Sequence, residues 1–175
     1  MLAQTKKRWH FAGRKDMGKS PLTQFQGSEG RRHLIRALTL QPLIHEQNLA
    51  IAVARQSKLE AVPAGANIIE QGSSDTDLFL ILEGAFSIAS DGHVVAQVKA
   101  GQHVGEMSAV DPHTPRSATV TAISDSIVAR ITESDFSALA DRFPQLWRRI
   151  ALELAGRLRN GYTGDRAREK AGHAA

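Results

Sequence analysis

The sequence predicts an α+β fold in which a small antiparallel β-roll of jelly-roll type is flanked by helices. Apolar residues recur with helical spacing before residue 59 and after residue 132, whereas residues 59–131 consist of short β-like runs. Gly, Asp, Ser or Pro turns separate these runs at intervals of roughly 8 to 12 residues, as is typical of sandwiches and barrels. The 175 residues, 42% of them hydrophobic, suffice for one sizeable core.

The chain is expected to divide into three parts. Residues 1–28 mix Lys, Arg, Gly, Ser, Gln and Pro without a sustained period, so they are expected to form a basic, disordered arm. Residues 29–162 are expected to form one domain. Residues 163–175 are expected to form a flexible tail.

Two short helices are predicted at the start of the domain. Leu34, Ile35 and Leu38 have the spacing of one helical face, residues 49–54 have that of a second, and Pro42 separates the two. The β-like runs follow, in the segments ANIIE, DLFLILEG, AFSIA, HVVAQV, SATVTAI and SIVARI. Between two of these runs, the pair Asp91-Gly92 predicts a tight β-hairpin.

Two helices are predicted to close the domain, in ESDFSALADRF and PQLWRRIALELAGRLRN. Apolar residues recur every four positions along the second of them, at Leu146, Ile150, Leu154 and Leu158. This spacing predicts a face used for the core or for helix pairing. Pro144 suits a first helical turn, and Gly161 and Gly164 predict the end of the helix.

Composition excludes several classes of protein. There is no cysteine, so no disulfide or thiolate chemistry is available, and a reducing cytoplasm is the expected location. No run approaches the roughly 18 apolar residues of a membrane span. Net charge is +7 over residues 1–36, −8 over 37–141 and +5 over 142–175. We interpret the basic ends as solvated tails and a solvated helix face, although nucleic acid, anionic lipid or an acidic partner would also suit them.

Residues 13–20, GRKDMGKS, match the spelling of a Walker A phosphate loop. Such a loop functions between a buried strand and a helix, whose amides contact the phosphates. Here the preceding segment is short and charged, Pro21 follows at once, and no βαβ repeat comes after it. We therefore do not expect nucleotide triphosphate hydrolysis.

A second phosphate motif lies within the β region. Gly105-Glu106-Met107-Ser108 is followed by Pro115-Arg116-Ser117-Ala118-Thr119-Val120, and both resemble the phosphate-binding cassette of cyclic nucleotide-binding domains. Such domains occur in catabolite-activator-type regulators, kinase regulatory subunits and cyclic nucleotide-gated channels. The resemblance also covers the segments PAG, EQG and FLILEG, and it spans roughly residues 33 to 160.

The residue types of this motif suit a cyclic phosphodiester. An arginine at 116 offers planar, permanently charged donors, and a helical turn beginning at Gly105 would direct backbone amides at the same phosphate. By the resemblance, Glu106 accepts a hydrogen bond from the ribose 2′-hydroxyl. The predicted ligand-binding residues are Val104, Gly105, Glu106, Met107, Ser108, Arg116, Ser117, Ala118 and Tyr162.

Contacts to the base are expected from an apolar wall and from the last helix. Val95, Val104 and Met107 are the candidates for the wall, and Arg157, Asn160, Gly161 and Tyr162 for the helix. Tyr162 could stack on a purine or lie at the surface of a frayed helix end.

Catalysis and metal binding are not expected. His93, His103, Glu106 and His113 lie in a β-rich region, as the ligands of cupin enzymes do, but no His-x-His pair is present. No nucleophile-elbow pattern accompanies a Ser, His and Asp set.

The resemblance implies a sensor that binds a 3′,5′-cyclic purine nucleotide and transmits a movement of its last helix. We favour cyclic AMP over cyclic GMP because the Arg-Ser-Ala run is most like the bacterial one. The tail is too short for a winged helix-turn-helix, so the output is expected in an effector partner, in self-association through the C-terminal helix, or in a segment outside this chain. Two alternatives remain: an interaction module of the same fold that binds no nucleotide, and a nucleic-acid-binding regulator that uses the basic ends.

Overall fold

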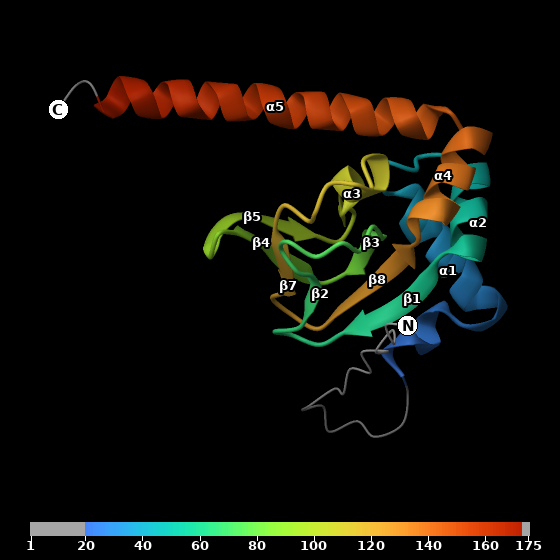
Figure 1. Ribbon diagram of the computed structural model, residues 1–175. Coiled ribbons are helices and arrows are strands. Elements are labelled where there is room, and N and C mark those ends of the chain that lie inside the picture. Colours follow the sequence, from blue (N-terminus) through green and yellow to red (C-terminus); the bar gives the residue numbers. More distant parts are fainter. Residues whose placement is uncertain (1–19, 173–175) are drawn as a thin grey trace, which may run out of the picture.

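The computed structural model describes the backbone of residues 20–172 and side chains as far as Arg159 (Figure 1). Eight strands form the roll: β1 (Lys58–Val62), β2 (Asn67–Ile69), β3 (Leu78–Glu83), β4 (Ala85–Ser90), β5 (His93–Lys99), β6 (His103–Val104), β7 (Thr119–Ala122) and β8 (Ser126–Ile131). The helices are the 3-10 helix η1 (Pro21–Phe25), α1 (Gly27–Thr39), α2 (Gln47–Gln56), α3 (Glu106–Val110), α4 (Glu133–Arg142) and α5 (Gln145–Gly172).

The strands form two antiparallel sheets of four, with the orders β1-β8-β3-β6 and β2-β7-β4-β5. Helices α1, α2 and α4 pack at one end of the roll, and α5 runs past α3 and extends beyond the sheets (Figure 1). The predicted α+β roll with flanking helices is therefore confirmed.

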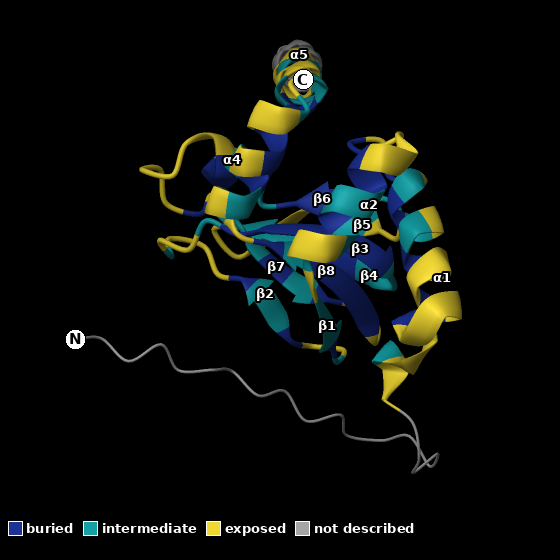
Figure 2. Ribbon diagram, turned by 90° about the vertical axis from the view of Figure 1, so that its right-hand side faces the viewer, coloured by how far each residue is buried: buried dark blue, intermediate teal, exposed yellow. Residues whose placement is uncertain are grey.

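The sequence of β3, LFLILE, is almost wholly apolar because the strand lies between two hydrophobic cores. Phe79 and Ile81 lie in the core between the two sheets, whereas Leu78, Leu80 and Leu82 pack in the core between roll and helices. Successive side chains of a strand point to opposite faces, so both faces of this strand must be apolar. Figure 2 shows β3 and β8 as the buried centre of the molecule. Burial of each such side chain contributes about 1.5–3 kcal/mol.

The β4–β5 hairpin has the geometry that Asp91-Gly92 predicts. Ser90 pairs with His93, and φ is 51° at Asp91 and 80° at Gly92. A two-residue turn with positive φ at both positions matches the right-handed twist of the strands.

Two of the expected boundaries need correction. Residues 21–25, expected within the arm, form η1, and the Phe25 side chain packs into the core with 6% of its surface exposed. The ordered fold therefore begins before residue 29. Helix α5 continues to Gly172, past the two glycines at 161 and 164 and through most of the expected tail. Residues 13–19 of the Walker-like segment lie outside the described residues.

Candidate functional site

A pocket of about 80 Å³ lies where β6 leads into α3, facing the segment that enters β7. Its lining consists of Ile69, Ile88, Val104, Gly105, Glu106, Met107, Ser108, Arg116, Ser117, Ala118, Val120 and Arg157. The structure thus brings together every predicted ligand-binding residue except Tyr162, whose side chain lies outside the described residues.

Arg116 is buried at the pocket, with 2% of its side chain exposed. Its Nε and Nη2 donate to Asp75 Oδ1 at 3.0 and 2.5 Å, and Nη2 also donates to the Asp77 carbonyl at 2.6 Å. Its Nη1 donates to the Gly105 carbonyl at 3.1 Å. A guanidinium has five N–H groups. One N–H on Nη1 is therefore left without an acceptor among the described residues, in a side chain that lines the pocket.

Asp75 and the backbone hold this guanidinium in position. Burial disfavours ionisation of Asp75, but hydrogen bonds from Arg116 and Ser73 outweigh it and lower the pKa of this carboxyl. The backbone of Arg116 is fixed as well, because its amide donates to the Ser73 carbonyl and its carbonyl accepts from the Gly72 amide.

The junction between β6 and α3, at position 105, favours glycine over every other residue type. The φ of Gly105 is 91°, a conformation that favours glycine. A Cβ atom there would lie 2.6 Å from the Asp77 carbonyl oxygen and 2.9 Å from Arg116 Nη1. A side chain at this position would thus displace the guanidinium or the backbone beside it.

Helix α3 begins at the pocket and carries a carboxylate there. The first amides of a helix have no acceptor within the helix, so those at the start of α3 are suited to an anion, as the sequence predicts. The Glu106 side chain is 3% exposed, and its Oε1 accepts a hydrogen bond from Arg157 Nη1 of α5.

Helix α5 makes a second polar contact with the roll. Arg157 Nη2 donates to Glu153 Oε1 at 2.7 Å, and Glu153 Oε2 lies 3.2 Å from Nε2 of the buried His103. The two atoms lie within ion-pair distance, but their arrangement does not meet the geometry of a hydrogen bond. Proximity to His103 and, to a lesser degree, Arg157 lowers the pKa of Glu153 to about 2, against the opposing effect of burial.

Comparison with known proteins identifies the family. Residues 59–143, which contain most of the pocket, match the family described as "Cyclic nucleotide-binding domain". The chain contains a cyclic nucleotide-binding domain. It is similar to the Pycsar effector proteins XpPycTIR of Xanthomonas perforans and BcPycTIR of Burkholderia cepacia, with 41% and 44% identity over 78% of this chain. The chain spans about half the length, 46%, of these relatives.

A solved structure supports the same assignment. The catabolite activator protein of Thermus thermophilus superposes with a TM-score of 0.65 at 27% sequence identity, over 71% of this chain and 61% of that protein.

Several features of the cyclic nucleotide-binding domain differ from the sequence prediction. Val95, expected in the apolar wall, is 63% exposed on β5 and does not line the pocket. The wall is completed by Ile69, Ile88 and Val120, none of which was among the predicted wall residues. Arg157, predicted near the base, lines the pocket and donates to Glu106 there.

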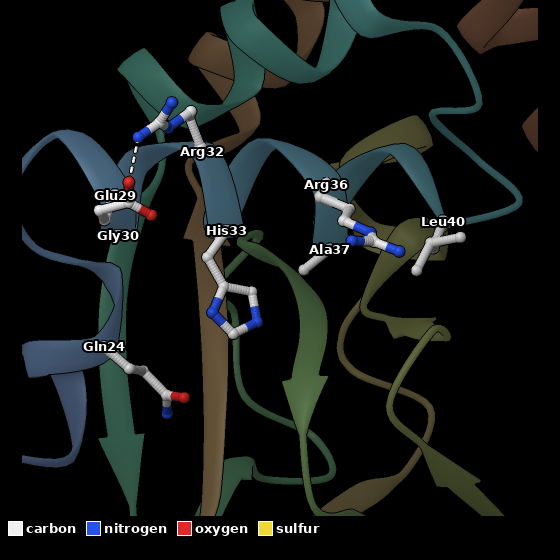
Figure 3. Close-up of a pocket in the computed structure, with 8 residues that line it drawn as sticks. All are labelled: Gln24, Glu29, Gly30, Arg32, His33, Arg36, Ala37 and Leu40. Atoms are coloured by element: carbon white, nitrogen blue, oxygen red, sulfur yellow. Dashed lines mark hydrogen bonds and ion pairs between the residues drawn. The ribbon is translucent and has the colours of Figure 1, made fainter.

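A larger hollow, of about 600 Å³, lies along α1, before the residues that match the family (Figure 3). Residues 24–40 alone line it, and Arg32 there is paired with Glu29. It lacks the combination of buried arginine and helix-start amides that the smaller pocket has. Within residues 20–159, no cluster of three or more His, Cys, Asp or Glu side chains suits a metal ion. None of the described helices is long and apolar enough to cross a bilayer.

Proposed function

We propose that the pocket binds a 3′,5′-cyclic nucleotide. The cyclic phosphate would accept hydrogen bonds from Arg116 and from the amides at the start of α3. Glu106 would accept a hydrogen bond from the ribose 2′-hydroxyl. One observation carries the proposal: a buried arginine with an N–H left over and a buried carboxylate line the same pocket. The cyclic phosphate carries one negative charge, and the guanidinium, which is already paired with Asp75, would donate its remaining N–H to it.

The remaining predicted residues would complete the site. Val104 and Met107 would contact the sugar and base, Ser108 and Ala118 would shape the pocket, and Tyr162 would stack on the base. The volume of about 80 Å³ is below the usual range for ligand pockets, so side chains at the rim must move as the nucleotide enters. Met107 suits this, because it is 47% exposed and has an unbranched side chain.

For the base we propose a purine, with cyclic AMP favoured over cyclic GMP. The preference for cyclic AMP rests on the Arg-Ser-Ala run at residues 116–118, which most resembles the bacterial one. Ser117 alone does not decide the base, because its hydroxyl lines the pocket and could reach a guanine amino group as well as the phosphate. A neutral hydrogen bond of this kind is worth about 1 kcal/mol, so the two nucleotides should differ by about tenfold at most.

We further propose that the domain is a sensor that transmits ligand binding through α5 to an effector. Helix α5 contacts the pocket through Arg157 and extends beyond the roll (Figure 1). The name of the Pycsar relatives, effector proteins, supports this output. A ligand can shift α5 only if it binds one position of the helix more tightly than another.

Calorimetric titration tests the proposal. Cyclic AMP, cyclic GMP, a cyclic pyrimidine nucleotide and linear 5′-AMP should be compared side by side. We expect micromolar or tighter binding of a cyclic nucleotide and none of 5′-AMP. Ser117→Ala, with Ser28→Ala on the exposed surface of α1 as control, tests the choice of base. Absence of binding by all four compounds would favour an interaction module without a ligand, and preference for cyclic GMP lost in Ser117→Ala would reverse the choice of purine.

A further inference from the structure

Four side chains form a continuous chain of polar contacts between the roll and α5. Glu106 accepts from Arg157 Nη1, Arg157 Nη2 donates to Glu153 at 2.7 Å, and Glu153 lies 3.2 Å from His103. The two roll residues are three positions apart on the segment that joins β6 to α3. The two α5 residues are one helical turn apart on one face. The contacts at Glu106 and at His103 therefore both hold α5 against the segment that forms the pocket.

The Arg157 guanidinium lies between two carboxylates. Its side chain is 50% exposed, whereas that of Glu106 is 3% exposed and has Arg157 as its one charged partner among the described residues. A buried carboxylate is costly unless a charge or hydrogen bond compensates it. The planar fork of an arginine also restricts the direction from which a carboxylate can bind. Arg157 thus compensates the burial of Glu106 and fixes its orientation.

The carboxylate retains capacity for a ligand. The hydrogen bond from Arg157 goes to Oε1, which leaves Oε2 for a ligand. A carboxylate can accept about four hydrogen bonds through its two oxygens. A ribose hydroxyl and Arg157 can therefore bind Glu106 at the same time, and neither must displace the other.

We propose that Arg157 is a positioning residue for Glu106, so that recognition of the ribose 2′-hydroxyl depends on the docking of α5. This inference rests on the proposed function. In this arrangement, α5 contributes to the choice between ribose and 2′-deoxyribose and leaves the phosphate contacts of Arg116 unchanged. Binding of a ribonucleotide would in turn favour the docked position of α5, because docking improves its hydroxyl contact.

The test compares two ligands that differ by one oxygen. Dissociation constants for the preferred 3′,5′-cyclic nucleotide and its 2′-deoxy analogue are measured by titration in wild type, Arg157→Met and Arg157→Lys. Arg148→Met, a change at an exposed arginine of the same helix, is the matched control. Glu106→Gln gives the reference for a lost carboxylate.

We expect wild type to prefer the ribonucleotide by about 10- to 100-fold, the range for a hydrogen bond to a charged group. Arg157→Met should reduce this preference to below about threefold, while affinity for the deoxy analogue changes by less than about twofold. Arg157→Lys should restore part of the preference, and Arg148→Met should retain all of it. Glu153→Gln, which removes the second partner of Arg157, should lower the preference by less than Arg157→Met.

Three results would overturn the inference. Tighter ribonucleotide binding in Arg157→Met would mean that Arg157 competes with the ligand. An equal loss for both ligands would mean a direct contact or a merely structural role, and an unchanged preference would mean that Arg157 has no influence on Glu106. In each of these cases wild type still binds, so the proposed function stands. Failure of wild type to bind any cyclic nucleotide would overturn both.

Discussion

The two arginines of the pocket differ in how the fold holds them. Arg116 is almost fully buried, and its four hydrogen bonds go to Asp75 and to backbone carbonyls of the roll. Arg157 is half exposed, and its partners are two carboxylates, one of them on its own helix. Arginine is thus held by partners within the roll at position 116, whereas at position 157 it connects α5 to the roll.

We expect the two arginines to contribute to different properties: Arg116 to the affinity for the ligand, and Arg157 to the coupling between ligand binding and the position of α5. A preorganised, buried charge loses little freedom when a ligand binds, so Arg116 should supply most of the binding energy for the phosphate. An ion pair whose arginine is half exposed is worth less, because solvent screens the guanidinium. Contacts of this smaller size suit the proposed role of α5, in which the helix changes position when the ligand binds.

The largest effect is expected from Arg116→Ala. Because the charge of the cyclic phosphate would then lack its buried partner, affinity should fall by about 2–4 kcal/mol, or roughly 30- to 1,000-fold. Titration measures the effect, and Arg55→Ala, a change at an exposed arginine of α2, serves as control. An unchanged affinity in a folded Arg116→Ala variant would remove this arginine from the site.

A smaller effect is expected from Asp75→Asn. Asp75 accepts two of the four hydrogen bonds that hold Arg116, so the substitution should leave the guanidinium less well positioned and weaken binding by about tenfold. Titration beside the exposed Asp141→Asn control measures it. Tighter binding would instead show that the Asp75 charge competes with the phosphate for Arg116. Arg116 would then be no better preorganised for the ligand than Arg157.

The motif predicted the residues that face the pocket better than the residues that support them. Gly105, Glu106 and Arg116 follow from local chemistry: a tight junction, an acceptor and a permanent cation. Asp75 is 41 residues from Arg116, and Arg157 is 51 residues from Glu106. Such pairs are created by the tertiary fold, and no periodicity or spacing in a single sequence indicates them.

The helix boundaries differ from prediction for local reasons. Phe25 lies in a polar segment without periodicity, and it becomes buried because η1 folds it back onto α1 and the core. Each glycine within a helix costs about 1 kcal/mol relative to alanine, which does not suffice to end α5 at residues 161 and 164 among good helix formers.

The smallest effect is expected at the distal end of the α5 network and depends on pH. The pKa of Glu153 is lowered from 4.5 to about 2, so its contacts stabilise the fold fully above pH 4.5 and are lost as pH falls toward 2. Because the Glu153 side chain is 35% exposed, solvent screening should limit the contribution to about 1 kcal/mol. Urea unfolding of wild type and Glu153→Gln at pH 6 and at pH 3 measures it, with the exposed Asp141→Asn as control. The difference between wild type and Glu153→Gln should shrink at the lower pH. A difference that stays constant from pH 6 to pH 3 would show that the carboxylate charge does not hold α5 to the roll, and the contrast between the two arginines would then rest on Glu106 alone.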